Sequence, residues 1–102
     1  MLYRVTFDPA AQDDLDEIAG WIAERASVAV AIGYVGRILD VCRRLDVFPR
    51  RGTMRDDLYP GLRTLGFERR AVIAFLVGQE DVHILRILYG GQDVERALGR
   101  LR

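Results

Sequence analysis

AVIAFLV (residues 71–77) and VHILRILY (residues 82–89) stand close together in the chain, and both are apolar at nearly every position. The turn-forming residues between them, from Gly78 to Asp81, predict a β-hairpin. Antiparallel strands with one wet face alternate apolar and polar residues, and these two strands do not alternate. We therefore expect cover on both faces of the sheet that contains this hairpin.

The chain before this hairpin begins with a strand and a helix. Residues 2–7 alternate and are typical of a short strand. Asp8 can cap a helix that begins at Pro9, and we expect this helix to end near Arg25. Trp21 lies beside its apolar stripe. That stripe recurs at helical spacing and consists of Ala11, Leu15, Ile18, Ala19, Ile22 and Ala26.

A second helix follows after a link that is too short for anything but an antiparallel helical hairpin. Ser27 can cap it, and Pro49 prevents it from continuing. Gly33 and Gly36 each cost about 0.5–1 kcal/mol relative to Ala inside a helix, which indicates close packing against the first helix. The predicted apolar stripe consists of Val28, Ile32, Val35, Ile38, Leu39, Cys42 and Leu45, continued by Phe48.

The polar segment that follows predicts a connection from the helices to the sheet. Residues 50–61 contain Gly and Pro and predict a loop. Residues 62–67 predict a strand, joined to residues 71–77 by a turn at Glu68 and Arg69. Three consecutive strands linked by short turns are antiparallel to one another.

The end of the chain predicts one more short element. Gly90 and Gly91 end the last strand, and residues 93–101 predict a C-terminal helix that carries Val94, Ala97, Leu98 and Leu101. The fold class is therefore α+β with the order β-α-α-β-β-β. A helical hairpin packs on a small, mainly antiparallel sheet and covers one face. The other face must be covered partly by the C-terminal tail or by another molecule.

Length and composition bound the class of protein. With 102 residues, half of them hydrophobic, the chain predicts a single domain over residues 1–102. Lys+Arg and Asp+Glu both number 15, so the zero net charge gives no global sign of nucleic-acid binding. All fifteen basic residues are Arg, which suits phosphates and carboxylates, although coding bias in a GC-rich genome has the same result.

The charges are unevenly distributed along the chain. Residues 1–24 contain six acidic residues and one Arg, whereas residues 25–70 contain ten Arg and five acidic residues. The early acids lie toward the positive end of the first helix's dipole, where negative charge is favourable. The Arg pairs form either a binding patch or a solvated surface, and they are Arg43/Arg44, Arg50/Arg51 and Arg69/Arg70.

Several classes of site have no support in the sequence. Cys42 is the single cysteine and falls on a helical stripe, so we expect a core thiol in a reducing compartment. The chain shows no signal peptide and no apolar run near the length of a membrane span, so the expected location is cytoplasmic. Zinc-ligand spacing, a phosphate-binding glycine loop and a Ser/His/Asp set are all absent. We therefore expect no metal and no cofactor.

Several stretches, in this order and at this total length, resemble the RelE/ParE superfamily of toxins from bacterial type II toxin–antitoxin modules. The Phe-Pro pair before a glycine loop, the Gly-Leu-Arg start of a strand and the Arg, Tyr, Gly, Gly cluster after the apolar strand favour the ParE-like branch. The matching stretches are YRVTFDPAAQDDLDEIAGWIAE (3–24), RILDVCRRLDVFPRRGT (37–53), GLRTLGFERRAVIAFLV (61–77) and VHILRILYGGQD (82–93).

This resemblance implies a partner and a target class. Such toxins are held inactive by a cognate antitoxin, whose N-terminal part binds operator DNA and whose disordered C-terminal part folds as it wraps the toxin. ParE-like members inhibit DNA gyrase, whereas RelE-like members enter the ribosomal A site and cut mRNA. We expect a gyrase inhibitor that is not itself an enzyme. The alternatives are a ribosome-dependent mRNA endonuclease and a degenerate, non-toxic member that only binds an antitoxin.

An exposed sheet face would suit an antitoxin segment, either as an added strand or as a docked helix. A tail that folds back after Asp93 would weaken this argument. Contacts with the antitoxin or the target are expected from Trp21, Arg63, Arg69, Arg70, Arg86 and Tyr89.

RNA cleavage without a metal needs a base, an acid and cations that stabilise the phosphorane. The resemblance implies Arg63, Arg70, Arg86 and Tyr89 as the set of a nuclease, with Arg69, Glu68 and His83 as further candidates. The chain has no Lys, and His83 lies near the start of its strand, both of which count against a nuclease.

Arg86 is the most informative single residue in this set. Arg86 and Tyr89 are three residues apart and face opposite sides of a regular strand, unless a bend reconciles them. Because Arg86 interrupts an apolar strand, it must have either a carboxylate partner or a ligand.

Overall fold

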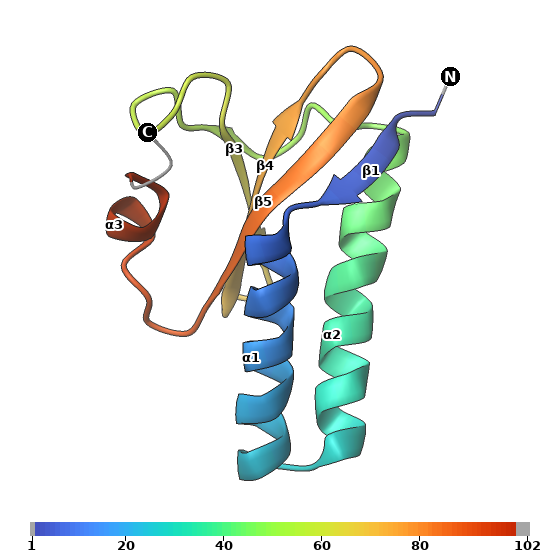
Figure 1. Cartoon of the computed structure of the whole chain (residues 1–102), viewed down its shortest axis with the longest axis vertical. Coiled ribbons are helices and arrows are strands. Elements are labelled where there is room, and N and C mark those ends of the chain that lie inside the picture. Colours follow the sequence, from blue (N-terminus) through green and yellow to red (C-terminus); the bar gives the residue numbers. More distant parts are fainter. Residues whose placement is uncertain (1, 100–102) are drawn as a thin grey trace.

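The computed structural model describes residues 2–99 and has the predicted α+β architecture, in which two long helices pack on one sheet (Figure 1). The elements are β1 (Arg4–Phe7), α1 (Pro9–Arg25), α2 (Val28–Arg43), a 3₁₀ turn (Arg44–Asp46), β2 (Thr53–Met54), β3 (Arg63–Phe67), β4 (Ala71–Val77), β5 (Asp81–Tyr89) and α3 (Val94–Gly99). The predicted helical hairpin and the predicted hairpin of apolar strands are both confirmed.

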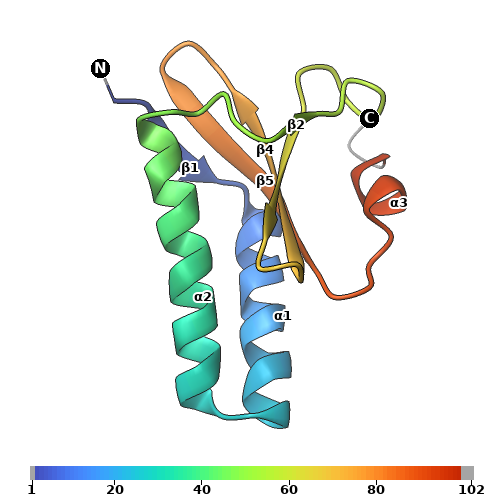
Figure 2. The same ribbon diagram turned by 180° about the vertical axis from the view of Figure 1, so that it is seen from behind.

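The five strands form one mixed sheet with the order β1-β5-β4-β3-β2. The pairs β5–β4, β4–β3 and β3–β2 are antiparallel, whereas β1 lies parallel to β5. Figure 2 shows the sheet from the other side, with β2 leading into β3. The loop predicted for residues 50–61 missed β2, because a two-residue strand carries no alternating pattern.

Both helix starts follow the sequence prediction. The side chain of Asp8 accepts a hydrogen bond from the amide of Ala10 at 3.0 Å, and that of Ser27 accepts one from the amide of Val30 at 3.1 Å. These bonds satisfy amide groups that the helix itself leaves unpaired.

The predicted apolar stripe of α2 is partly wrong. The buried residues of this helix are Ala31, Tyr34, Ile38 and Cys42. Val28 and Ile32 are instead 64% and 68% exposed, because the buried face of the helix runs through Ala31 and Tyr34 and these two residues lie outside it. The glycine prediction is also wrong, since nothing lies within 4 Å of an added Cβ at Gly36 and only the side chain of Arg37 does so at Gly33.

The end of α2 departs from the prediction at one residue and agrees at another. The α-helix ends at Arg43, and the 3₁₀ turn redirects the chain, so that Phe48 is 72% exposed rather than part of the stripe. Cys42 is fully buried as predicted, and burial raises the pKa of its thiol to about 12.

The second face of the sheet is covered by the chain itself. A buried cluster on this face consists of Leu62, Ala74, Leu88 and Leu98, with Leu58 and Tyr59 packed against it. Leu98 belongs to α3, which lies across the sheet from the helical hairpin (Figures 1 and 2). Of the two alternatives that the sequence left open, the C-terminal tail is therefore the cover for the part of this face that α3 packs against. Residues 100 and 101 of the predicted terminal helix lie outside the described residues.

No helix within residues 2–99 combines the length and the apolar character that a membrane span requires.

Replacing Leu98 by Ala tests the cover supplied by α3. We expect Leu98→Ala to lower the free energy of unfolding by about 2–3 kcal/mol, because a fully buried leucine leaves a cavity. Binding of the dye ANS should rise as Leu62 and Leu88 become accessible. Arg96→Ala, at an exposed position of the same helix, is the control. Unchanged unfolding in urea for Leu98→Ala would contradict this role of α3.

Asp8 predicts a dependence of stability on pH. The pKa of its carboxyl lies below the ordinary value of 3.8, first because it accepts the amide hydrogen of Ala10 and second because His83 lies beside it. A carboxyl with a lowered pKa stabilises the fold above its unfolded pKa, and that contribution is lost as the pH falls through the folded-state pKa. Asp8→Asn keeps a capping side chain without the charge.

The stability difference between wild type and Asp8→Asn should therefore be constant near neutral pH and shrink as the pH falls below 3.8. Urea unfolding over a pH series measures it, with Asp16→Asn at an exposed position of α1 as the control. A difference that persists undiminished in acid would contradict the role of the Asp8 charge.

Candidate functional site

The outer edge of β5 is the first feature of the site. β1 pairs with β5 only as far as Ile84, so the second half of this edge has no neighbouring strand. Asp14, on α1, takes the place of that strand. Its carboxylate accepts the amide hydrogen of Ile87 at 2.8 Å and two bonds from the guanidinium of Arg86, at 2.8 and 2.9 Å. Arg86 therefore has a carboxylate partner, which decides between the two alternatives that the sequence left open.

Burial and charge make this contact a structural one. Asp14 is 8% exposed and is the one buried charged residue among residues 2–99. The hydrogen bond to Asp14 raises the pKa of the Arg86 guanidinium above its ordinary value. Both charges are thus satisfied within the chain.

A β-bulge in β5 changes which side chains face the helices. Phe75 pairs with Ile84 and Ala74 pairs with Arg86, so Leu85 has no partner opposite it. This extra residue lets both Ile84 and Ile87 lie in the core beneath the helices. This bulge lies before Arg86 and not between Arg86 and Tyr89, so it is not the bend that was expected to reconcile the two. Arg86 bonds to α1, and Tyr89 contacts rings of α1 and α2.

Three aromatic rings meet where β5 ends. The ring of Tyr89 contacts Trp21 of α1 and Tyr34 of α2, both edge-to-face with centroids 5.5 Å apart. Trp21 remains 44% exposed, and the guanidinium of Arg25 lies 4.1 Å from the centre of its ring. The hydroxyl of Tyr34 is buried without a hydrogen-bond partner, and burial raises its pKa.

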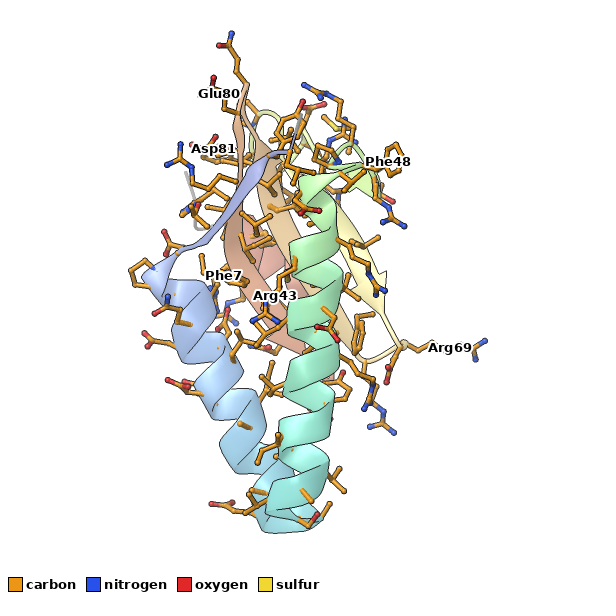
Figure 3. The ribbon with its side chains drawn as sticks, turned by 90° about the vertical axis from the view of Figure 1, so that its right-hand side faces the viewer. Phe7, Arg43, Phe48, Arg69, Glu80 and Asp81 are labelled. Atoms are coloured by element: carbon orange, nitrogen blue, oxygen red, sulfur yellow. The ribbon has the colours of Figure 1, made fainter. Side chains whose placement is uncertain are left out.

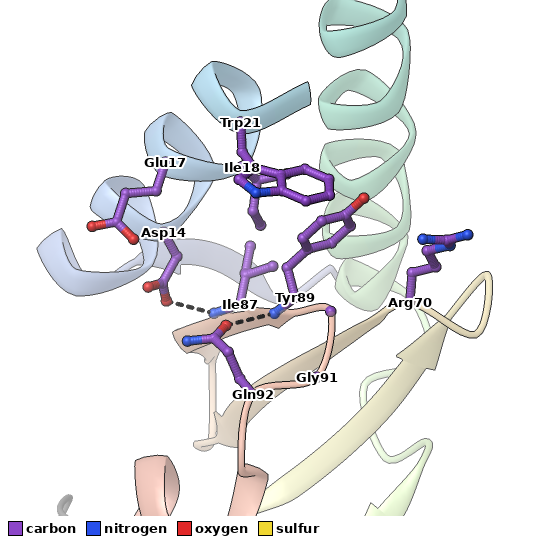
Figure 4. A pocket seen from close by; sticks show the side chains of 10 residues that line it. Asp14, Glu17, Ile18, Trp21, Arg70, Ile87, Tyr89, Gly91 and Gln92 are labelled. Carbon is purple, nitrogen blue, oxygen red and sulfur yellow. Dashed lines mark hydrogen bonds between the residues drawn. The ribbon is translucent and has the colours of Figure 1, made fainter. Parts of the chain in front are cut away.

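A pocket of about 320 Å³ lies between α1 and the end of β5 (Figure 4). Trp21 and Tyr89 form its apolar wall, and Gln92 closes it by accepting the amide hydrogen of Tyr89 at 2.7 Å. Asp14 and Arg70 lie on opposite sides of it in Figure 4. The lining residues are Asp14, Glu17, Ile18, Trp21, Arg70, Ile87, Tyr89, Gly90, Gly91 and Gln92.

A second pocket, of about 500 Å³, continues from the first toward the tip of the helical hairpin. The two pockets share Trp21, Arg70 and Tyr89. The second pocket is also lined by Arg37 of α2 and Glu68 of the β3–β4 turn, which form a two-bond ion pair with distances of 2.8 and 3.1 Å. Arg37 lowers the pKa of the Glu68 carboxyl.

The β3–β4 turn sets the direction of two predicted site residues. Glu68 and Arg69 have φ of 48° and 60°, a region that costs side-chain-bearing residues about 1 kcal/mol or more each. The ion pair to Arg37 holds this turn against α2. As a result Arg70 lines both pockets, whereas Arg69 extends away from the molecule (Figure 3).

The remaining predicted residues lie elsewhere. Arg63, on β3, donates to the carbonyl of Arg51 and lines neither pocket. His83 lies near the start of β5, where its ring nitrogens contact Thr6 at 2.8 Å and Asp8 at 3.2 Å. The structure thus brings together Trp21, Arg70 and Tyr89, and it separates the rest from them.

Four residues of this site were not predicted from the sequence, and they are Asp14, Tyr34, Arg37 and Gln92. Asp14 was interpreted only as one of several acids near a helix start. Its spacing contained the missing signal, because position 14 is three residues after Ala11 and four before Ile18 and so falls on the buried stripe. A lone acid on one apolar stripe and a lone Arg in an apolar strand predict a pair. We find no comparable signal for Tyr34, Arg37 or Gln92.

The comparisons with known proteins show the family to which the chain belongs. The family model for the ParE toxin of type II toxin–antitoxin systems, parDE, matches residues 5–94. The chain belongs to the ParE toxin family.

Relatives of the ParE family match this chain over nearly its whole length. Toxin ParE3 of Caulobacter vibrioides is 44% identical over 97 residues, which cover 95% of this chain and 96% of that protein. Toxin ParE1 of Mycobacterium tuberculosis is 30% identical over 98 residues, covering 96% of this chain and 100% of that protein. A solved structure described as the chromosomal ParDE TA system from P. aeruginosa superposes with a TM-score of 0.76 at 27% identity, covering 87% of this chain and 97% of that one.

Within residues 2–99 of this ParE toxin, His, Cys, Asp and Glu do not gather in any group of three that could hold a metal ion. The described side chains at the pockets include aromatic, aliphatic, basic and acidic groups. They suit contact with a polypeptide, since apolar rings and charges of both signs meet on one surface.

Removing one partner of the Asp14–Arg86 pair should destabilise this ParE toxin. We expect Arg86→Ala to lower the free energy of unfolding by about 2–4 kcal/mol, because Asp14 is then buried with one remaining hydrogen bond. The double variant Asp14→Ala/Arg86→Ala should cost less than the sum of the single changes. Urea unfolding measures all three, with Arg69→Ala as the control. Strict additivity of the two changes would show that the pair contributes no coupling.

Proposed function

We propose that this ParE toxin inhibits DNA gyrase and is neutralised by a cognate antitoxin encoded in the same module. Its membership of the ParE family over residues 5–94 carries the proposal. The match to a solved ParDE system supports a two-component arrangement, because that structure is described by the names of both components. In this proposal the antitoxin binds DNA through its N-terminal part and wraps the toxin with its C-terminal part.

The positions of the candidate nuclease residues favour gyrase inhibition over mRNA cleavage. Arg86 is bonded to Asp14, and Glu68 to Arg37, so neither group is available to a phosphate or a hydroxyl. Tyr89 is packed between two aromatic rings. Cleavage of RNA requires an acid, a base and cations within reach of one phosphate.

The other candidate nuclease residues do not line the pockets together, which also speaks against RNA cleavage. Arg63 lines neither pocket, and His83 contacts Asp8 and Thr6 rather than a residue of the pockets. Of the four residues of the expected nuclease set, Arg70 and Tyr89 line the same pocket. An arginine and a packed tyrosine are a weak acid–base pair at neutral pH, and this supports a target other than RNA.

Supercoiling by purified gyrase tests the proposed target. Added in increasing amounts, the toxin should reduce the conversion of relaxed to supercoiled plasmid, and adding the antitoxin first should restore it. The same preparation should leave no A-site cuts when toeprinting is carried out on translating ribosomes.

Other outcomes of these assays would replace the proposal. Normal supercoiling together with A-site cuts would assign the chain to the mRNA endonucleases. Normal supercoiling, uncut mRNA and unimpaired growth without the antitoxin would describe a member that has lost toxicity and retains only binding.

A further inference from the structure

The two pockets form one groove whose chemistry is specific enough to describe what occupies it. They meet at Trp21, Arg70 and Tyr89, so a chain lying in one pocket can continue into the other. We propose that this groove is the docking site of an acidic segment of the antitoxin, in which a bulky apolar side chain stands beside a carboxylate. This inference rests on the proposed function, because it takes the antitoxin to be the partner.

The apolar part of the proposal comes from Trp21. A tryptophan that is 44% exposed leaves a large apolar surface facing water at the point where the pockets join. Its contact with Tyr89, which in turn contacts Tyr34, holds the ring in a defined place. Rigid aromatic surfaces of this kind dominate binding energies at protein interfaces. A bulky apolar side chain of the partner therefore fits over these rings.

The acidic part of the proposal comes from Arg70. Within residues 2–99 the structure records no ion pair and no side-chain hydrogen bond for Arg70, whereas Arg37 is neutralised by Glu68. Arg25, stacked on Trp21, donates to the carbonyl of Trp21 at 3.3 Å, and its nearest carboxylate is that of the exposed Glu24 at 3.9 Å. Two cations thus line the same pocket as the exposed ring, and a carboxylate next to the apolar anchor complements them.

The opposite end of the groove argues against a nucleic acid as the occupant. Glu17 lines the first pocket beside Asp14, whose charge is neutralised by Arg86, and a phosphate backbone crossing the groove would meet the Glu17 carboxylate. A polypeptide can instead place a neutral or basic residue there.

Random linear peptides displayed on phage and panned on the immobilised full-length protein test this proposal. We expect the enriched peptides to combine an acidic residue with a neighbouring bulky apolar residue. Their affinity should fall about tenfold or more for Arg70→Glu and for Trp21→Ala. Changing the peptide's acidic residue to Arg should restore binding to Arg70→Glu.

Matched controls exist within the chain. Arg69→Glu places the same change on the neighbouring residue of the same turn, where the side chain points away from the groove (Figure 3), and should alter affinity less than about twofold. Phe48→Ala removes an aromatic residue that is 72% exposed and lines neither pocket, and should also leave binding unchanged. Thermal unfolding of each variant confirms that the fold is retained.

Three results would overturn the proposal. In the first, the enriched peptides bind Arg70→Glu as tightly as wild type. In the second, the enriched peptides lack the combination of an acidic and a bulky apolar residue. In the third, single-stranded RNA oligonucleotides bind in a way that depends on Arg70, whereas peptide binding does not. The supercoiling assay separates this result from the proposed function. If peptides bind in the groove but the protein leaves gyrase active, gyrase is not the target and the docking site stands. If the protein inhibits gyrase but binds no such peptides, gyrase is the target and the docking site is wrong.

Discussion

The arrangement of this small domain depends on how the exposed edge of β5 is satisfied. A parallel strand of four residues, β1, pairs with only the first half of a nine-residue strand. Backbone amides left on such an edge must find other acceptors. Asp14 supplies one of them and binds Arg86 with the same carboxylate, and Gln92 supplies another to Tyr89. Because side chains rather than another strand bond to this part of the edge, the edge borders a groove.

Patterns that extend over many residues predicted the fold well. Two strands apolar on both faces, two helix caps and a short link between helices were sufficient for the hairpins and the mainly antiparallel sheet. Features that depend on one or two residues were not predicted. β2 is too short to show alternation. The stripe of α2 was misplaced because this helix is apolar on more than one face, and periodicity does not reveal that Ala31 rather than Val28 or Ile32 is buried.

The candidate site was predicted only in part, for a physical reason. Strand and helix periodicity indicates which residues share a face, but Arg69 and Arg70 lie in a turn. The directions of their side chains depend on the positive φ angles of Glu68 and Arg69, which these residue types do not predict. The cover that α3 gives to the second sheet face also changes the argument for a partner. With Leu98 buried there, the case for a partner no longer rests on an exposed sheet face. It rests on family membership and on the groove at the other side of β5.

One tryptophan in the whole chain, at position 21, has a practical consequence. Indole emission depends on the polarity around the ring, and here the ring is half in water, beneath a guanidinium and beside Tyr89. The molecule thus contains a single indole, and it lies at the junction of the two pockets. A molecule that displaces solvent from that junction should therefore change the tryptophan emission spectrum of the unlabelled protein, to which no second indole contributes.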